Sequence, residues 1–154
     1  MRIAVASDHA GVPLNDTIIT ELERLGHEVV DLGGHDANSA DDYPGYAMAV
    51  ADQLLSGRCD RGILVCGSGV GAAVAANKFA GIRAGLCHDT YSAHQGVEHD
   101  NMNVLCLGAR VVGPELALEL VRTFLAARFR GEARHLRRLA EIAEIEQGSR
   151  TLKS

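Results

Sequence analysis

The segment from Ile63 to Lys78 constrains the fold of this chain more than any other stretch. An apolar run short enough to be a buried strand ends at Cys66, passes through the alternating glycines of residues 67–71 and continues into an alanine-rich run. This order predicts a strand, a tight turn and a helix. Glycines let successive backbone N–H groups point outward, and a helix start adds its positive end. The turn is therefore a place for an oxyanion or a phosphate.

The rest of the chain repeats this alternation of strand-like and helix-like segments. Apolar runs predict strands at residues 2–7, 27–32, 62–66, 83–87 and 104–107. Helical patterns lie at residues 13–25, 43–56, 70–78, 91–98, 114–128 and 134 to about 147. Apolar strands separated by helices favour a parallel sheet covered on both faces. We therefore predict an α/β fold: a single Rossmann-like doubly wound domain over residues 1–154, with a five-stranded parallel sheet, a C-terminal helix and a frayed tail at 148–154.

Charge and cysteine usage narrow the class of protein. A formal net charge of −5 and an isoelectric point near 5.8 argue against a general nucleic-acid or membrane-surface binder. The four cysteines form no Cys-x-x-Cys pair, which favours reduced thiols over a disulfide framework or a zinc ribbon. Because the first predicted strand starts at Arg2, we expect no signal peptide. No apolar run is long enough to span a bilayer. We expect a soluble, cytoplasmic protein.

Chemically reactive side chains follow several of the predicted strands. Asp8 and His9 follow the first strand, Cys66 ends the third and Arg110 follows the fifth, while residues 41–44 precede a helix. Ligands of open parallel sheets bind beyond the carboxyl ends of the strands. A buried core needs none of these polar groups, so their common edge favours a binding or catalytic site.

Cys66 is the candidate catalytic group. Aligned amides and a helix start favour the thiolate form of a cysteine, which can act as a base. The alternative is a small apolar residue that closes a buried strand. The glycine loop that follows favours the chemical role, whereas Cys59, Cys87 and Cys106 are expected to be buried and inert.

The glycine loop has other interpretations. It could form only a tight strand-to-helix turn. A dinucleotide site is disfavoured, because the loop follows the third strand and lacks a paired ribose-binding acid, and the Walker pattern is absent. His88, His94 and His99 are not spaced to share one helix face, so we expect no metal.

A set of motifs runs in order along almost the whole chain: Ser7–Gly11, Asp42–Pro44, Cys66–Gly71, Asn77–Ala84, Tyr91–Ala93, Asn103–Leu105, Gly108–Gly113, Arg134-His135 and Arg138. This set resembles the type B ribose-5-phosphate isomerase family, which also includes the galactose-6-phosphate isomerase subunits. The resemblance implies a cofactor-free interconversion of an aldose phosphate and a ketose phosphate, usually ribose 5-phosphate and ribulose 5-phosphate. It also implies a homodimer, or a dimer of dimers, with sites at the subunit interface.

Such a reaction moves a proton between neighbouring carbons through an enediolate whose oxygens need stabilising. We expect Cys66 as the base, with Ser68 as a hydroxyl donor or proton relay, and the resemblance implies His99 as the acid that opens the furanose ring. The expected substrate-binding residues are Asp8, His9, Tyr43, Gly67, Ser68, Gly69, Val70, Gly71, Asp100, Arg110, Arg134 and Arg138.

Within this set, the loop amides would hold the enediolate oxygens. Arg134 and Arg138 lie four residues apart and can clamp a phosphate, which the resemblance assigns to them together with His9. Asp8 and Tyr43 would contact sugar hydroxyls or assist ring opening, although Asp8 could instead cap a turn.

His99 is expected after a helix and before the fifth strand, near the amino ends of the strands. A strand of about five residues spans roughly 17 Å, too far for contact with Cys66 of the same chain. We therefore hypothesise that His99 serves the site of a neighbouring subunit. His94 and His135 are expected to be exposed loop histidines.

One departure from the family pattern concerns the substrate. The family commonly has His-Asn-Asp where this chain has His99-Asp100-Asn101. A tetrose or hexose phosphate is therefore an alternative substrate. A second alternative is a non-catalytic sugar-phosphate or nucleotide binding module, which would not require a thiol at position 66.

Overall fold

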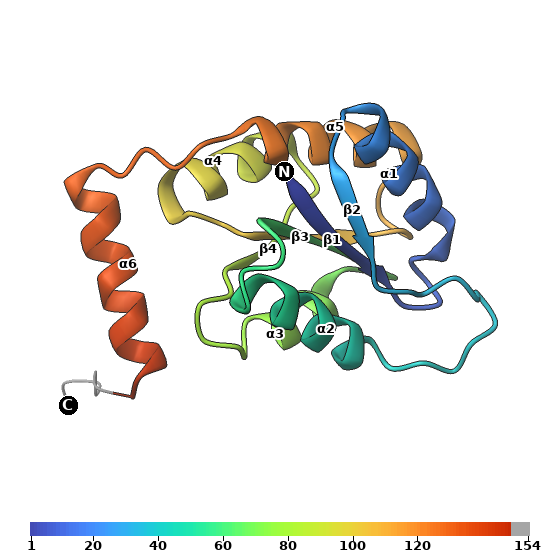
Figure 1. Cartoon of the computed structure of the whole chain (residues 1–154), viewed down its shortest axis with the longest axis horizontal. Coiled ribbons are helices and arrows are strands. Elements are labelled where there is room, and N and C mark those ends of the chain that lie inside the picture. The colour runs from blue at the N-terminus through green and yellow to red at the C-terminus, as the bar shows by residue number, and fades with distance from the viewer. Residues whose placement is uncertain (149–154) are drawn as a thin grey trace.

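Five parallel strands form the centre of the computed structural model, which describes residues 1–148 (Figure 1). They are β1 (Arg2–Ser7), β2 (Glu28–Asp31), β3 (Arg61–Cys66), β4 (Ala84–Leu86) and β5 (Val104–Gly108), in the spatial order β2-β1-β3-β5-β4. The register pairs Ser7 with Val65, and Cys66 with Gly108, so the carboxyl ends of β1, β3 and β5 lie level. The predicted five-stranded parallel sheet is confirmed.

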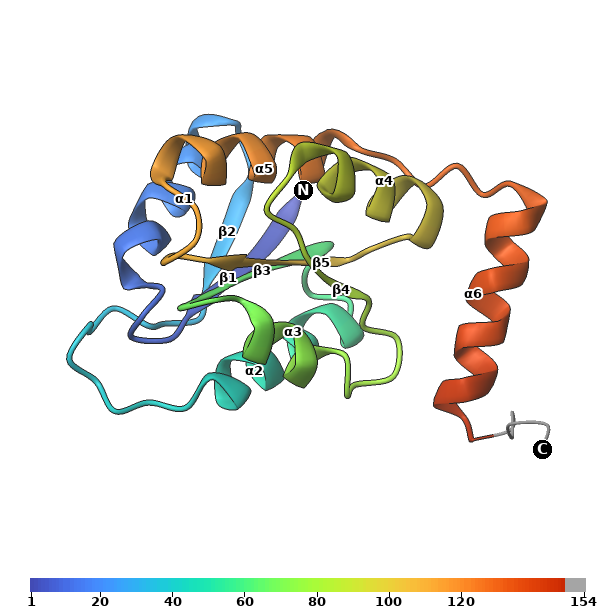
Figure 2. The ribbon, with the colours of Figure 1, turned by 180° about the vertical axis from the view of Figure 1, so that it is seen from behind.

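Helices cover both faces of the sheet (Figure 2). One face carries α1 (Val12–Arg24), α4 (Thr90–Asp100) and α5 (Pro114–Ala126), and the other carries α2 (Tyr43–Leu55) and α3 (Val70–Ala76). Side chains alternate along β3 between the two cores: Ile63 and Val65 belong to the first face, and Leu64 and Cys66 to the second. The Cys66 side chain therefore lies on the side of α2 and α3.

The connections place a crevice between β1 and β3. From β1 the chain leaves across one face through α1, and from β3 it leaves across the opposite face through α3. Strands whose outgoing connections lie on opposite faces leave an opening at their carboxyl ends, where ligands of such sheets bind. The topology therefore predicts a ligand site at the carboxyl ends of β1 and β3.

The fourth helix is longer than the predicted segment 91–98. Asp89 caps its start by accepting a hydrogen bond from the Ser92 N–H at 2.7 Å, and Asn101 ends it in a left-handed conformation, with φ of 49°. His99 and Asp100 consequently lie in the last turn of α4, which leads into the amino end of β5, and not in a loop after it.

The last helix, α6 (Ala133–Glu146), lies at one end of the molecule (Figures 1 and 2) and contacts the body through His135 and Glu146. Its apolar Leu136 and Ile145 are 53% and 61% exposed. Apart from Gly148, the tail predicted at 148–154 lies outside the described residues. Within residues 1–148, no helix is long and apolar enough to cross a membrane.

Candidate active site

A pocket of about 360 Å³ opens at the carboxyl edge of the sheet, between the ends of β1 and β3. The end of β3 contributes the thiol and the glycine loop, the start of α2 contributes an aromatic ring, and the turn after β5 contributes a guanidinium group. The lining residues are Asp8, His9, Ala10, Tyr43, Cys66, Gly67, Ser68, Gly71, Arg110 and Val111.

Cys66, the last residue of β3, lines this pocket. Its residue is only 5% exposed, and its Sγ accepts a hydrogen bond from the Gly69 N–H at 3.0 Å. Such a donor stabilises the negative charge that a thiolate carries. Burial raises the pKa of the Cys87 thiol to about 11 and also raises that of Cys106, so both stay neutral. The expected inert role of these two cysteines agrees with their burial.

The loop after Cys66 requires glycine at two positions for different reasons. Gly69 has a φ of 80°, and a Cβ there would lie 2.9 Å from the backbone carbon of Leu107. A Cβ on Gly71 would lie 2.7 Å from Cζ of Tyr43, because the aromatic ring rests directly on this turn. The glycines therefore let the loop turn tightly against β5 and let Tyr43 reach the pocket.

Arg110 is tied to the same loop through its backbone. Its N–H donates to the Gly67 carbonyl at 3.0 Å, and the Ala109 N–H donates to the Cys66 carbonyl at 2.8 Å. The pocket therefore holds a guanidinium beside the thiol and the glycine turn. This is a suitable environment for an anionic group of a ligand.

Asp8 and Ser68 both make local hydrogen bonds at the rim of the pocket. Asp8 Oδ1 accepts from the N–H groups of Ala10 at 3.0 Å and Gly11 at 3.1 Å, so the turn-capping role considered from the sequence is present. Ser68 Oγ accepts from the Val70 N–H at 3.3 Å. Both residues still line the pocket, where a ligand can reach them.

His9 is held by residues to which the sequence analysis assigned no role. Its Nδ1 lies 3.1 Å from Asp41 Oδ1, and Tyr46 Oη donates to Asp41 Oδ2 at 2.6 Å. Asp41 belongs to the polar residues 41–44 already noted before a helix, whereas Tyr46 carried no signal in the sequence.

Six of the predicted site residues do not line the Cys66 pocket. Gly69 and Val70 belong to the glycine loop beside it, and the other four lie elsewhere in the chain. His99 lies in the last turn of α4, with its ring stacked on that of His135 at a centroid distance of 4.4 Å. Arg134 Nη2 pairs with Glu132 at 3.1 Å, and Arg138 is exposed on α6. Asp100 lines a different pocket.

The expectation of an exposed loop histidine is wrong for His135. It lies on α6 and is fully buried, because it packs between the rings of His99 and Phe129. The Arg134 Nε–H donates to its Nε2 at 3.2 Å, and its Nδ1 finds no hydrogen-bond partner within residues 1–148. His94 is exposed as expected, but it lies on α4 and not in a loop.

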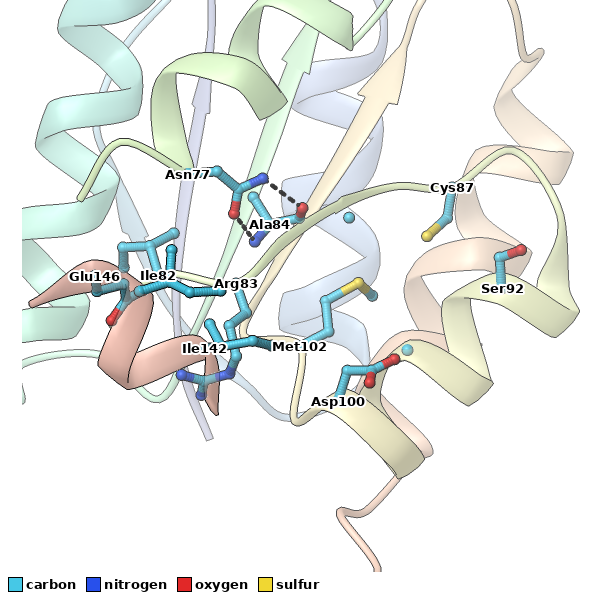
Figure 3. A pocket seen from close by; sticks show the side chains of 13 residues that line it. Asn77, Ile82, Arg83, Ala84, Cys87, Ser92, Asp100, Met102, Ile142 and Glu146 are labelled. Carbon is cyan, nitrogen blue, oxygen red and sulfur yellow. Dashed lines mark hydrogen bonds between the residues drawn. The ribbon is translucent and has the colours of Figure 1, made fainter. Parts of the chain in front are cut away.

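A second pocket, of about 520 Å³, lies between α6 and the body of the molecule (Figure 3). Its walls are mostly apolar, and the Asn77 side chain bridges to the backbone of Ala84 with two hydrogen bonds of 2.8 Å. The neutral Cys87 thiol offers no base here, so catalysis is better placed at the smaller pocket. The lining residues are Asn77, Ile82, Arg83, Ala84, Gly85, Cys87, Ser92, Gly96, Asp100, Met102, Ile142, Ile145 and Glu146.

Fold and site together define a class: an α/β protein with a polar small-molecule pocket at the carboxyl edge of its sheet. Residues 1–148 contain no group of three or more His, Cys, Asp or Glu residues arranged to hold a metal ion. The model of the Ribose/Galactose Isomerase family matches residues 3–142, and the chain belongs to this family.

Two curated relatives are similar over most of their length. Ribose-5-phosphate isomerase B of Escherichia coli is 46% identical over 146 residues, which cover 95% of this chain and 97% of the relative. D-erythrulose-4-phosphate isomerase of Pectobacterium atrosepticum is 42% identical over 131 residues, covering 85% and 86% of the two chains.

Solved structures agree with the fold. Ribose-5-phosphate isomerase B of Clostridium thermocellum superposes with a TM-score of 0.93 at 46% identity, over 97% of this chain and 100% of that one. The Mycoplasma genitalium ribose-5-phosphate isomerase B with bound ribulose-5-phosphate gives a TM-score of 0.89 at 41% identity, over 95% and 96%.

Proposed function

We propose that residues 1–154 form a single sugar-phosphate isomerase domain that interconverts ribose 5-phosphate and ribulose 5-phosphate without a cofactor. Family membership and the similarity to named ribose-5-phosphate isomerases support the reaction class. The observation that carries the proposal is the Cys66 thiol, which accepts an amide hydrogen bond and lines a pocket that Arg110 also lines.

In this mechanism the Cys66 thiolate removes the proton from C2 of the open-chain aldose, next to the carbonyl carbon. The electron pair moves into an enediolate, whose oxygens lie against the amides of the 67–71 loop. A proton moves from the oxygen on C2 to the oxygen on C1, with the Ser68 hydroxyl as relay, and the sulfur returns its proton to C1. No oxidant or reductant is needed, because C1 is reduced and C2 is oxidised within the same molecule.

Binding of the substrate needs cations for the phosphate and polar groups for the sugar. His9, Arg110, Asp8 and Tyr43 of the same chain line the pocket. His9 would bind the phosphate, Arg110 would be a further ligand contact, and Asp8 and Tyr43 would contact sugar hydroxyls or assist ring opening.

The remaining residues would come from a second copy of the chain. The active form is then a homodimer, or a dimer of dimers, in which His99 opens the sugar ring at the neighbouring site, Asp100 contacts the sugar, and Arg134 and Arg138 bind the phosphate. Two observations support this: these four residues lie outside the Cys66 pocket of their own chain, and α6 presents uncovered apolar side chains. A reduced thiol base fits a cytoplasmic enzyme.

Isotope exchange tests the reaction. Ribose 5-phosphate incubated with the protein in deuterated water should acquire deuterium at C2, and Cys66→Ala should abolish the exchange while leaving sugar-phosphate binding intact. Cys106→Ala is the control for loss of a thiol. Binding without exchange by the unaltered protein would identify a non-catalytic module and overturn the proposal.

The same assay selects the substrate. One relative is named as an isomerase of a four-carbon sugar phosphate, so aldose phosphates of four to six carbons should be compared by kcat/KM. The proposal requires the five-carbon substrate to give the highest value; a higher value for another length would reassign the substrate.

A further inference from the structure

The segment between β2 and α2 folds back onto the end of β1. The Ser7 Oγ–H donates to the Gly34 carbonyl at 2.8 Å, and the Ser7 N–H donates to the Gly33 carbonyl at 3.3 Å. A Cβ on Gly34 would overlap the Ser7 carbonyl oxygen, so only glycine permits this approach. The anchor brings the later part of the segment, with Asp41, beside the residues that follow β1.

Asp41 receives three hydrogen bonds there. Its Oδ1 accepts from the His9 backbone N–H at 3.1 Å and lies 3.1 Å from His9 Nδ1, while its Oδ2 accepts from Tyr46 Oη at 2.6 Å. The Asp41 side chain is only 18% exposed. One carboxylate thus joins the turn after β1 to the first turns of α2.

The bond to the ring determines which nitrogen of His9 carries a proton. A carboxylate can only accept, so His9 Nδ1 carries a proton, and the other ring nitrogen, Nε2, is left for a ligand in the pocket that His9 lines. Nε2 donates to a phosphate oxygen when the ring carries both protons, and it accepts when the ring carries only the one on Nδ1. Without this partner, the imidazole could rotate and present either nitrogen.

We propose that Asp41 is a positioning residue, which acts through His9 by fixing its ring so that Nε2 faces the phosphate of the substrate and donates to it from the doubly protonated ring, and that Tyr46 in turn fixes Asp41. The inference rests on the proposed function for the identity of the ligand. Carboxylate–imidazole pairs of this kind orient histidine ligands in other settings, notably around metals.

The charge states of the group suit this role. The hydroxyl of Tyr46 holds the pKa of the Asp41 carboxyl below its ordinary value, and the bonds from His9 act in the same direction. The bond to Asp41 raises the pKa of Tyr46 to about 12, so its hydroxyl stays a donor. At neutral pH Asp41 is therefore ionised and Tyr46 is protonated, so the Tyr46 hydroxyl continues to donate to the Asp41 carboxylate.

The test begins with the ligand-free protein. In ¹⁵N spectra of the histidine rings above neutral pH, His9 should have its proton on Nδ1, and Asp41→Ala should shift the population toward Nε2–H. Asp36→Ala removes a carboxylate from the same segment, where it accepts only from a local amide, and should leave the His9 signals unchanged. An unaltered tautomer in Asp41→Ala, or an equal change in Asp36→Ala, would overturn the inference.

Binding and turnover give the second measurement. Asp41→Ala should weaken ribose 5-phosphate binding and raise KM by about 10-fold, the loss of one charge-assisted hydrogen bond, with kcat within about 2-fold of the unaltered protein. Tyr46→Phe should raise KM by less, about 3-fold, because Asp41 keeps its bonds to His9. A fall in kcat with unchanged KM would contradict a positioning role toward the phosphate.

Asp41→Asn keeps the test decisive if the alanine variant unfolds. Its carboxamide oxygen can still accept from His9 and its NH2 can donate to the Tyr46 oxygen, but the negative charge is lost, so an intermediate rise in KM is expected and an unchanged KM would count against the inference. Failure of the proposed function is distinguishable. A protein that binds no sugar phosphate can still show the Asp41-dependent tautomer, whereas an active enzyme with an Asp41-independent His9 refutes only the inference.

Discussion

The Cys66 pocket and the α6 region differ in how far their own chain completes them. In the pocket, the thiol, the glycine turn, Arg110 and His9 all come from the edge of one sheet, and backbone hydrogen bonds lock them together. On α6, Arg138 is exposed, Arg134 contacts Glu132 and His135, which are close to it in sequence, and apolar side chains are exposed.

The difference indicates two kinds of assembly. The pocket is built by the topology of the parallel sheet, which brings distant segments to one edge regardless of any partner. The α6 region carries exposed cationic and apolar side chains that lie outside the Cys66 pocket of the same chain. A second copy of the chain would bring the substrate phosphate in its own pocket to these arginines, and it would cover the apolar side chains of α6.

The largest effect expected on the α6 side of this comparison concerns Arg134. Replacement by alanine should raise KM for ribose 5-phosphate by about 10- to 100-fold, because a guanidinium–phosphate contact is lost, with a smaller change in kcat. The neighbouring Arg137→Ala, also exposed on α6, is the control for loss of charge. Equal KM values for the two variants would remove Arg134 from the site.

For the pocket, two glycines with left-handed backbone conformations test how tightly the turn after Cys66 is packed. Gly57 has a φ of 71° and open space where a Cβ would lie, whereas Gly69 has a φ of 80° and no such space. Gly57→Ala should lower the free energy of unfolding by about 1 kcal/mol, and Gly69→Ala by about 3 kcal/mol, because the second also pushes into β5. Urea unfolding of both variants measures the difference, and equal losses would show that the turn is not tightly packed.

The smallest effect expected concerns the pH dependence of α6 docking. Burial lowers the pKa of His135 below its ordinary 6.5, and His99, Arg134 and Arg138 act in the same direction, against Glu132. The undocked helix then binds the proton more readily, so docking is strongest above pH 6.5 and weakens as the pH falls below it.

Hydrogen exchange of the α6 amides at pH 7.5 and 5.5 measures this effect, after correction for intrinsic exchange rates. Protection should fall at the lower pH in the unaltered protein. His135→Phe keeps a ring on His99 without a titrating group and should lose the difference. A pH dependence retained in that variant would assign the effect to other groups.

Sequence patterns predict those features of the two regions that depend on local interactions. They do not predict features that depend on contacts between distant segments. The strand–glycine–helix pattern at residues 63–78 predicts the sheet edge and the position of Cys66, because both depend on local periodicity and on the general topology of parallel sheets. Burial of His135 could not be predicted in this way, since it arises from stacking on His99 of another helix.

Asp41 illustrates the same limit within the pocket. Its bond to His9 exists only because the segment after β2 folds back onto Ser7, and no periodic pattern encodes that return. The sequence pattern predicts α4 too short, because the end of this helix depends on the left-handed conformation of Asn101, which the pattern does not reveal. The roles of His99, Asp100, Arg134 and Arg138 stay predictions.

Mixing two inactive variants tests the shared site most directly. Cys66→Ala and His99→Ala chains, unfolded and refolded together in equal amounts, should form mixed dimers that each contain one intact site, restoring about a quarter of the wild-type isomerase activity. Each variant refolded alone should stay inactive. If the mixture recovers no activity although mixed dimers form, His99 and Cys66 do not act across the interface, and the account of a shared site is contradicted.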